Sequence, residues 1–212
     1  SSSNTPANGD AGLNMNEGTV LVGGPNPSVL SIAAGVRLGN LLIGDGINPK
    51  VFTIQTGTTS AQMISPGAIT VKSGCTFYVG GTAAGDAGVR GISIGTATAG
   101  VPPLTGGITI EPGATMAVQV PTATNTCNVE MQGGTLTNNG TIMTSATGGG
   151  FTRTLNFNFS NLTVTPGSNT IHVAGTNPVT FSSISLANPS GLFLSTSATV
   201  NATMTLTNGN IT

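Results

Sequence analysis

Residues 69–77 read Ile-Thr-Val-Lys-Ser-Gly-Cys-Thr-Phe, and the same pattern recurs once before them and once after them. Residues 30–38 read Leu-Ser-Ile-Ala-Ala-Gly-Val-Arg-Leu and residues 108–116 read Ile-Thr-Ile-Glu-Pro-Gly-Ala-Thr-Met, so the three segments start at equal intervals along the chain. Each combines an apolar residue, a serine or threonine and a second apolar residue with a glycine and a large apolar residue at fixed later positions. A fixed period in this range is typical of stacked repeat architectures.

Further short apolar segments lie before the first copy, at residues 20–22, and between the copies, at residues 51–54 and 92–94. In most of them apolar residues flank a serine or threonine, which predicts a strand with one face inward and the hydroxyl outward. Because an extra strand falls between successive copies, we interpret each full repeat as two coils of roughly 20 residues. The sequence therefore predicts an all-β fold, namely a parallel β-helix or solenoid.

This interpretation makes a prediction about individual side chains. Val71 and Ile110 should be buried in one apolar stack, whereas Thr70 and Thr109 should face outward. The alternative fold is one or more β-sandwich domains, because short strands separated by frequent turns fit that architecture too. A sandwich gives no reason for the sequence to repeat, so we favour the solenoid.

The domain organisation follows from the extent of this pattern. Residues 1–18 are polar and glycine-rich, and we expect them to form an N-terminal lead-in or cap. Residues 19–212 are expected to form one β-solenoid segment. Solenoids normally finish with a polar cap, and none is visible before residue 212, so we expect the segment to continue in a longer protein.

The composition excludes several functional classes. Only 5% of the residues are charged, the net charge is −1, and there are five lysines and arginines in total. That is too few for the basic patch of a nucleic-acid-binding protein. No apolar run approaches the roughly 18 residues of a membrane-spanning helix. The neutral surface, rich in threonine, asparagine and glycine, is what we expect of an extracellular protein.

The titratable residues do not predict a catalytic site. The six acidic residues are Asp10, Glu17, Asp45, Asp86, Glu111 and Glu130, and the three arginines are Arg37, Arg90 and Arg153. Glycosidase chemistry needs two carboxylates within about 10 Å of each other, and no such local pair exists. We therefore expect no enzyme activity, no cofactor, and no catalytic, cofactor-binding or metal-binding residues.

A few polar residues need individual interpretation. Asp45 lies in a Gly-Asp-Gly turn and is expected to cap that turn, because calcium requires several carboxylates. His172 lies between two apolar residues of a predicted strand and should point into solvent. Cys75 and Cys127 both fall on inward positions. We favour two buried thiols over a disulfide, because their separation of more than two coils exceeds the reach of a bridge, about 7 Å between Cα atoms.

Residues 108–115, 134–142 and 204–212 resemble the repeats of large bacterial cell-surface adhesins. The similarity is greatest to the long secreted adhesins of Bacteroidetes, including those used in gliding motility, and next to autotransporter passengers. Most of residues 20–212 share the general pattern of these repeats, through short motifs of low complexity. The resemblance implies a β-rich stalk, export to the cell surface and a role in attachment, and it transfers no functional residue to this chain.

These observations together suggest a function. We expect a structural and adhesive segment of a bacterial cell-surface filament or giant adhesin that mediates attachment, with gliding as one context. Its expected partners are a surface or polysaccharide substratum, neighbouring coils or subunits of the same filament, and secretion or anchoring machinery. One alternative is an extracellular filament subunit that adds a strand to its neighbour's sheet. A second alternative is a carbohydrate-active β-helix.

Overall fold

The computed structural model describes residues 18–32, 39–56, 67–79, 92–94, 106–118, 127–131, 134–143, 147–148, 151–152, 155–159, 170–187 and 189–212. These residues form nineteen β-strands, and there is no helix among them. Most of the strands belong to three parallel sheets, which we call sheets 1, 2 and 3. The predicted all-β fold class is therefore confirmed.

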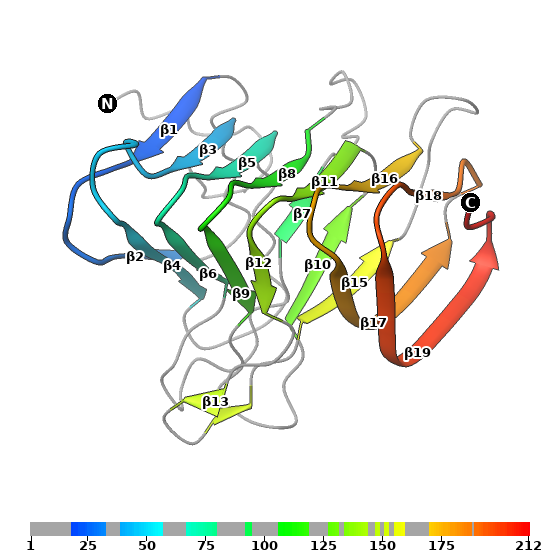
Figure 1. Cartoon of the computed structure of the whole chain (residues 1–212). Coiled ribbons are helices and arrows are strands. Elements are labelled where there is room, and N and C mark those ends of the chain that lie inside the picture. The colour runs from blue at the N-terminus through cyan, green and yellow to red at the C-terminus, as the bar shows by residue number, and fades with distance from the viewer. Residues whose placement is uncertain are drawn as a thin grey trace, which may run out of the picture.

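Sheet 1 has seven strands, and they follow one another in chain order across the sheet. They are β1 (Thr19–Val22), β3 (Asn40–Ile43), β5 (Ala68–Val71), β8 (Ile108–Ile110), β11 (Gly134–Asn138), β16 (Ile171–Ala174) and β18 (Leu192–Leu194). Every neighbouring pair is parallel. Figure 1 shows this row running from blue at β1 to orange at β18, so the chain advances steadily along one axis.

Sheets 2 and 3 have five strands each and are also parallel throughout. Sheet 2 contains β2 (Ser28–Ile32), β4 (Val51–Thr56), β6 (Thr76–Val79), β9 (Thr115–Val118) and β12 (Thr141–Met143). Sheet 3 contains β7 (Ile92–Ile94), β10 (Cys127–Met131), β15 (Leu155–Phe159), β17 (Val179–Ala187) and β19 (Ala198–Asn208). A separate antiparallel pair is formed by β13 (Thr147–Gly148) and β14 (Phe151–Thr152).

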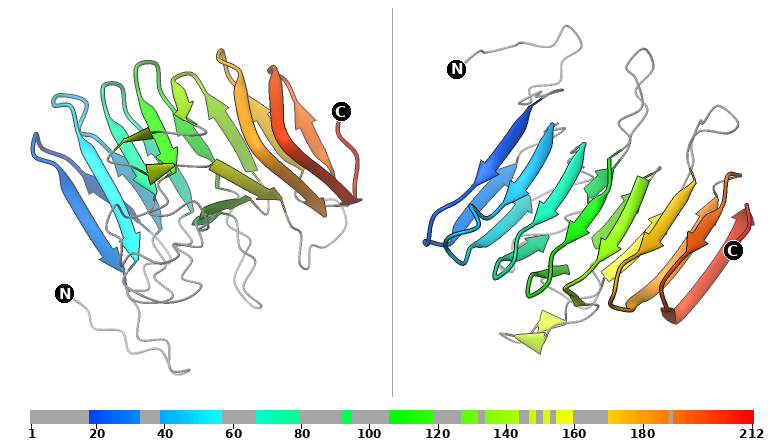
Figure 2. Two further views of the ribbon diagram at one scale, coloured as in Figure 1. Left: turned by 90° about the horizontal axis from the view of Figure 1, so that it is seen from below. Right: turned by 45° about the horizontal axis from the view of Figure 1, so that its top comes forward.

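The chain returns to sheet 1 repeatedly, while β1–β4 alternate between sheets 1 and 2 and β16–β19 between sheets 1 and 3. In the middle of the molecule it runs from β5 in sheet 1 to β6 in sheet 2 and β7 in sheet 3, and then returns as β8, β9 and β10. We call the chain from one strand of sheet 1 to the next a pass. Successive passes lie side by side in both views of Figure 2. The parallel pairing argues against the sandwich alternative, whose sheets are antiparallel.

The core lies between the inner faces of the three sheets. Val71 and Ile110 are paired in register and are fully buried, whereas Thr70 and Thr109 beside them are only half-buried on the outer face. The predicted inward and outward positions are therefore confirmed. The same alternation buries side chains from all three sheets in one cluster, including Leu41, Phe52, Phe77, Leu136, Phe181 and Leu186.

The predicted repeat is correct for its last two copies and wrong for the first. Ile69 pairs directly with Ile108 in sheet 1, and Thr76 pairs with Thr115 in sheet 2, so residues 69–77 do lie beside residues 108–116. Leu30, however, belongs to β2 of sheet 2 and pairs with Ile54. Residues 30–38 resemble the other two copies because strands of both sheets alternate inward apolar residues with outward residues in the same way.

The predicted coil length also needs correction. Because Ile69 and Ile108 are direct neighbours in sheet 1, the whole repeat between them makes one pass and not two. Other passes are much shorter, since Val20 already pairs with Leu41. Residues 52–54 and 92–94, which the sequence analysis treated as equivalent, lie in different sheets, namely β4 of sheet 2 and β7 of sheet 3. Loops of unequal length between the strands account for this variation.

A column of glycines marks the start of five successive strands of sheet 1. It consists of Gly18, Gly39, Gly67, Gly106 and Gly134. Asn40 N donates to Gly18 O at 2.8 Å, and a Cβ added to Gly67 would lie 2.8 Å from Gly39 O. A Cβ on Gly106 would overlap Gly67 O, and one on Gly134 would overlap Gly106 O. At Gly67, Gly106 and Gly134 neighbouring passes thus approach so closely that no side chain fits between them.

Candidate functional site

The outer face of sheet 1 is a regular surface built from seven parallel strands. In-register pairing aligns outward side chains of successive strands into rows. One row consists of Leu21, Leu42, Thr70, Thr109, Thr137 and Ala174, and the other includes Thr19, Asn40, Ala68, Thr135, His172 and Phe193. Parallel strands lie about 4.8 Å apart, so the two rows form an extended surface. We call it the neutral face.

The neutral face carries no permanent charge. Its side chains are aliphatic, hydroxyl or amide groups, together with the rings of His172 and Phe193. Three threonines, Thr70, Thr109 and Thr137, lie on adjacent strands in the same row. Such a surface can bind a partner through van der Waals contacts and neutral hydrogen bonds, without the cost of removing water from an ion.

A shallow groove lies at the β1 end of the neutral face. It has a volume of about 300 Å³ and is lined by Thr19, Asn40, Leu41, Leu42, Ala68 and Thr70. Hydroxyl and amide groups therefore border an aliphatic floor. This combination matches a ligand that has both hydroxyl groups and apolar C–H surface, such as a neutral sugar ring.

His172 and Phe193 occupy the opposite end of the same face. Both side chains are exposed, and their ring centroids are 5.4 Å apart with planes tilted by 52°. Because Ile171 and Val173 are fully buried, the predicted outward orientation of His172 is confirmed. The sequence analysis missed its aromatic neighbour, which comes from the next pass.

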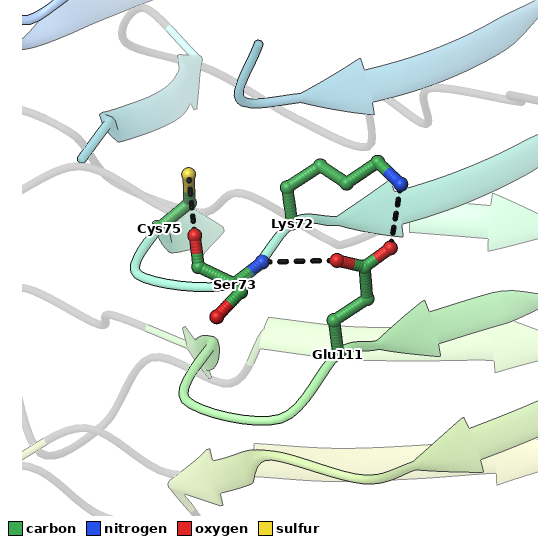
Figure 3. Close-up of polar contacts among 4 residues, drawn as sticks. All are labelled: Lys72, Ser73, Cys75 and Glu111. Atoms are coloured by element: carbon green, nitrogen blue, oxygen red, sulfur yellow. Dashed lines mark hydrogen bonds and ion pairs between the residues drawn. The ribbon is translucent and has the colours of Figure 1, made fainter. Parts of the chain in front are cut away.

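A salt bridge joins two passes at the turn between sheets 1 and 2. Lys72 Nζ lies 2.6 Å from Glu111 Oε1, and Ser73 N donates to Glu111 Oε2 at 3.1 Å, as Figure 3 shows. Burial alone would raise the pKa of Glu111, but these two hydrogen bonds and the positive charge of Lys72 outweigh it and lower the pKa. Lys72 and Glu111 hold the same position in the two aligned copies, which is a signal that could have identified the pair.

Asp45 caps the turn that follows β3. Its Oδ1 accepts hydrogen bonds from Ile47 N and Asn48 N, both at 2.9 Å, and its Oδ2 accepts one from Gly24 N at 3.0 Å. The three backbone bonds, together with one from the Asn48 side chain, hold the pKa of Asp45 well below its usual value. The predicted turn-capping role is confirmed, and the bond to Gly24 also ties the cap to the preceding pass.

The side chains of Lys50 and Cys75 are both buried. Lys50 is only 3% exposed, and its Nζ donates to Asn26 O and to Ser28 Oγ, both at 2.6 Å. Cys75 is buried and is a free thiol, as we expected. Cys127 begins β10, but its side chain lies outside the described part of the structure. Sequence analysis missed Lys50, although it stands two residues before Phe52 and so shares that residue's inward direction.

The structure does not describe the side chains of the remaining acidic residues and arginines. Asp10, Glu17, Asp86, Arg37, Arg90 and Arg153 lie outside the described residues, and the side chain of Glu130 in β10 does too. Within the part that the structure describes, no three His, Cys, Asp or Glu residues are grouped to hold a metal ion. The absence of a catalytic site stays a prediction.

Among the described residues, no helix has the length and apolar character needed to span a membrane. No protein-family model, curated protein or solved structure matches this chain.

Proposed function

We propose that this chain is a structural and adhesive segment of an extracellular filament at a bacterial cell surface, and that its three sheets are the faces of a parallel β-helix. Sheets of parallel strands visited in a repeating order support the β-helical architecture. In such a rod each pass contacts its neighbours only, so length is gained by adding passes. The rod would hold other parts of the filament at a distance from the cell, and it would present its outer faces to a partner, in attachment or in gliding.

The observation that carries this proposal is the neutral face. It extends over seven in-register strands and carries no permanent charge, and its groove joins hydroxyl and amide groups to an aliphatic floor. Repeated weak contacts along one rigid surface add up when the partner is itself repetitive. A neutral polysaccharide substratum fits this description better than a nucleic acid, which would require a basic surface.

The proposal is tested by placing charge in the middle of the neutral face. We expect the double variant Thr70→Lys/Thr109→Lys to adsorb to amorphous cellulose or agarose films at least about tenfold more weakly than the wild type, because two ammonium groups would lose water on contact. Adsorbed mass is measured with a quartz crystal microbalance on the purified chain. Thermal melting checks that the variant remains folded.

A matched control comes from sheet 2. Thr76 and Thr115 are also half-buried outward threonines, paired in register on the same two passes. The double variant Thr76→Lys/Thr115→Lys carries the same added charge on another face and should adsorb like the wild type. An equal loss in both variants would show that the neutral face is not the contact surface. A wild-type chain that adsorbs to neither film would overturn the proposal.

A further inference from the structure

His172 and Phe193 form a pair of exposed rings on the neutral face, and we call these two side chains the ring pair. Three phenylalanines of the described structure pack in the core, namely Phe52, Phe77 and Phe181. Phe193, by contrast, is 42% exposed. His172 is exposed beside it, with the two ring centroids 5.4 Å apart. The ring pair thus presents aromatic surface to solvent on a face whose other side chains are aliphatic, hydroxyl or amide groups.

The ring pair lies within sheet 1 and not at a free strand edge. β16 pairs with β11 on one side and with β18 on the other. β18 is bonded on its far side too, because Thr212 N donates to Leu192 O at 2.9 Å and Leu194 N donates to Thr212 O at 2.8 Å. The outward direction of both rings is therefore fixed by strands that are hydrogen-bonded on both sides.

The geometry of the ring pair suits a flat ligand that has C–H groups on its face and hydroxyl groups on its rim. The two ring planes are tilted by 52°, so a ligand stacked on Phe193 meets the imidazole of His172 at an angle. The π electrons give an aromatic face a partial negative charge, which attracts the slightly positive C–H groups of a sugar ring. The imidazole nitrogens donate and accept hydrogen bonds, as the hydroxyl groups of a sugar require.

Hydroxyl groups also border the ring pair. Thr135 of β11 pairs in register with His172 and lies in the same outward row. Ser195 is exposed two residues after Phe193, and its Oγ donates to Val173 O at 3.3 Å, which uses its proton but not its two lone pairs. Ligand sites combine apolar contact surface with a few polar groups that orient the ligand. The ring pair and these hydroxyl groups supply both.

We propose that the ring pair binds one ring of a neutral polysaccharide, with a C–H face of the sugar stacked on Phe193 and a sugar hydroxyl hydrogen-bonded to His172. This inference rests on the proposed function, since it names a contact that the attached polysaccharide makes at the β18 end of the neutral face. The groove is lined from β1, β3 and β5, so β18 lies four strand spacings beyond it, roughly 19 Å away. A chain of several sugars that crosses the strands would occupy both sites, and each contact would strengthen the other.

Two other kinds of partner fit the ring pair less well. An organic cation also stacks on aromatic rings, but the sequence has no acidic residue after Glu130 that could balance its charge here. A protein partner needs about 800 Å² on each side for a stable contact, whereas the two rings present an aromatic surface the size of a single sugar ring. A neutral sugar therefore matches both the charge and the size of the ring pair.

The test is an NMR titration of the purified chain with two soluble probes, cellohexaose and neoagarohexaose. The wild type should bind at least one of them, with amide shifts in residues 171–174 and 192–195 and with nuclear Overhauser effects between the Phe193 ring and sugar C–H protons. Phe193→Ala should raise the dissociation constant at least about tenfold, because the stacking surface is lost. Phe193→Trp keeps an aromatic face and should retain the affinity. A wild type that binds neither probe would overturn the proposal, including the case in which the ring pair serves a protein partner.

The matched control is Val51→Ala, which removes an apolar side chain of similar exposure, 39%, from β4 of sheet 2 and should leave the affinity unchanged. Thermal melting checks that each variant is folded. Unchanged affinity in Phe193→Ala, or amide shifts confined to the groove strands β1, β3 and β5, would refute the assignment of the ring pair.

The same variants separate this inference from the proposed function. If Phe193→Ala binds the probes and the films like the wild type, while Thr70→Lys/Thr109→Lys loses adsorption, attachment through the neutral face stands and the ring pair has no part in it. If the ring pair binds a hexasaccharide but the wild-type chain adsorbs to neither film, the sugar site stands and the attachment function fails.

Discussion

The first passes of the chain contain charged side chains that bond to neighbouring backbone atoms, and the last pass contains none. In the first passes the Asp45 carboxylate reaches back to Gly24 N, and the Lys50 amine reaches back to Asn26 O. In the last pass no charged residue is present at all, and Met204 and Leu206 remain half-exposed. Charged groups therefore tie the second pass to backbone atoms of the first, whereas the last pass has neutral side chains only.

Strands with the same alternation of inward and outward residues therefore occur both with and without charged side chains beside them. Gly24 and Asn26 lie between β1 and β2, so the charged groups join the turns of two neighbouring passes and are not part of the strand pairing itself. The comparison predicts that the two ends will respond differently to mutation and to pH.

The largest expected difference concerns a charge placed on an inward position. Val71→Asp should lower the free energy of unfolding by about 3–5 kcal/mol, because the carboxylate would be buried without a partner. Met204→Asp introduces the same group in β19, where the side chain is 49% exposed, and should cost less than about 1 kcal/mol. Urea denaturation measures both. Thr70→Asp, beside Val71 but facing outward, is the control and should be tolerated; equal costs at all three positions would refute the assigned register.

The next effect concerns the buried amine of Lys50, which joins the second pass to the first. Lys50→Met keeps most of the side-chain volume but leaves Asn26 O and Ser28 Oγ without their donor, which should cost about 1–3 kcal/mol. The matched variant Lys72→Met removes only the half-exposed ion pair with Glu111 and should cost no more than about 1 kcal/mol. Both values come from the same urea titration. If Lys50→Met were as stable as the wild type, the amine would not hold the first pass in place.

The smallest expected effect is a local increase in the rate of amide hydrogen exchange at low pH. The folded-state pKa values of Asp45 and Glu111 are both lowered, so their contributions are present above the unfolded values and are lost as the pH falls through the folded ones. Between about pH 5 and pH 2, amide hydrogen exchange should speed up more in residues 18–79 than in residues 170–212, where the sequence has no acidic residue. Exchange rates are compared after correction for the intrinsic effect of pH. Asp45→Asn should reduce the difference, and a uniform response along the chain would contradict the assignment.

Much of the strand pattern could be predicted from sequence because it depends on local alternation. The inward position of Val71, the outward position of His172 and the turn-capping role of Asp45 each follow from the nearest few residues. Local alternation does not show which strand lies beside which. Leu30 and Ile69 stand in similar sequence contexts, and yet they belong to different sheets.

A better signal for sheet 1 was present in the sequence but is only recognisable with the structure. A glycine stands two residues before Val20, Leu41, Ile69, Ile108 and Leu136, at the point where neighbouring passes touch. The distances between these glycines along the chain are unequal, so a search for a fixed period does not find them. The groove, the ring contact of His172 and the bonds of Lys50 all join different passes, and for that reason they too required the structure.

The unequal length of the passes has an evolutionary consequence. The pass that brings Val173 to Leu194 is little more than half as long as the one that brings Ile69 to Ile108, and the strands remain in register in both cases. Insertions and deletions between the strands are therefore compatible with an unchanged core. Selection can alter the connecting segments, or duplicate and delete whole passes, while the stack of strands stays the same. In such a lineage the length of the protein and the sequences of its loops can diverge quickly, and only the glycine and apolar positions need to be retained.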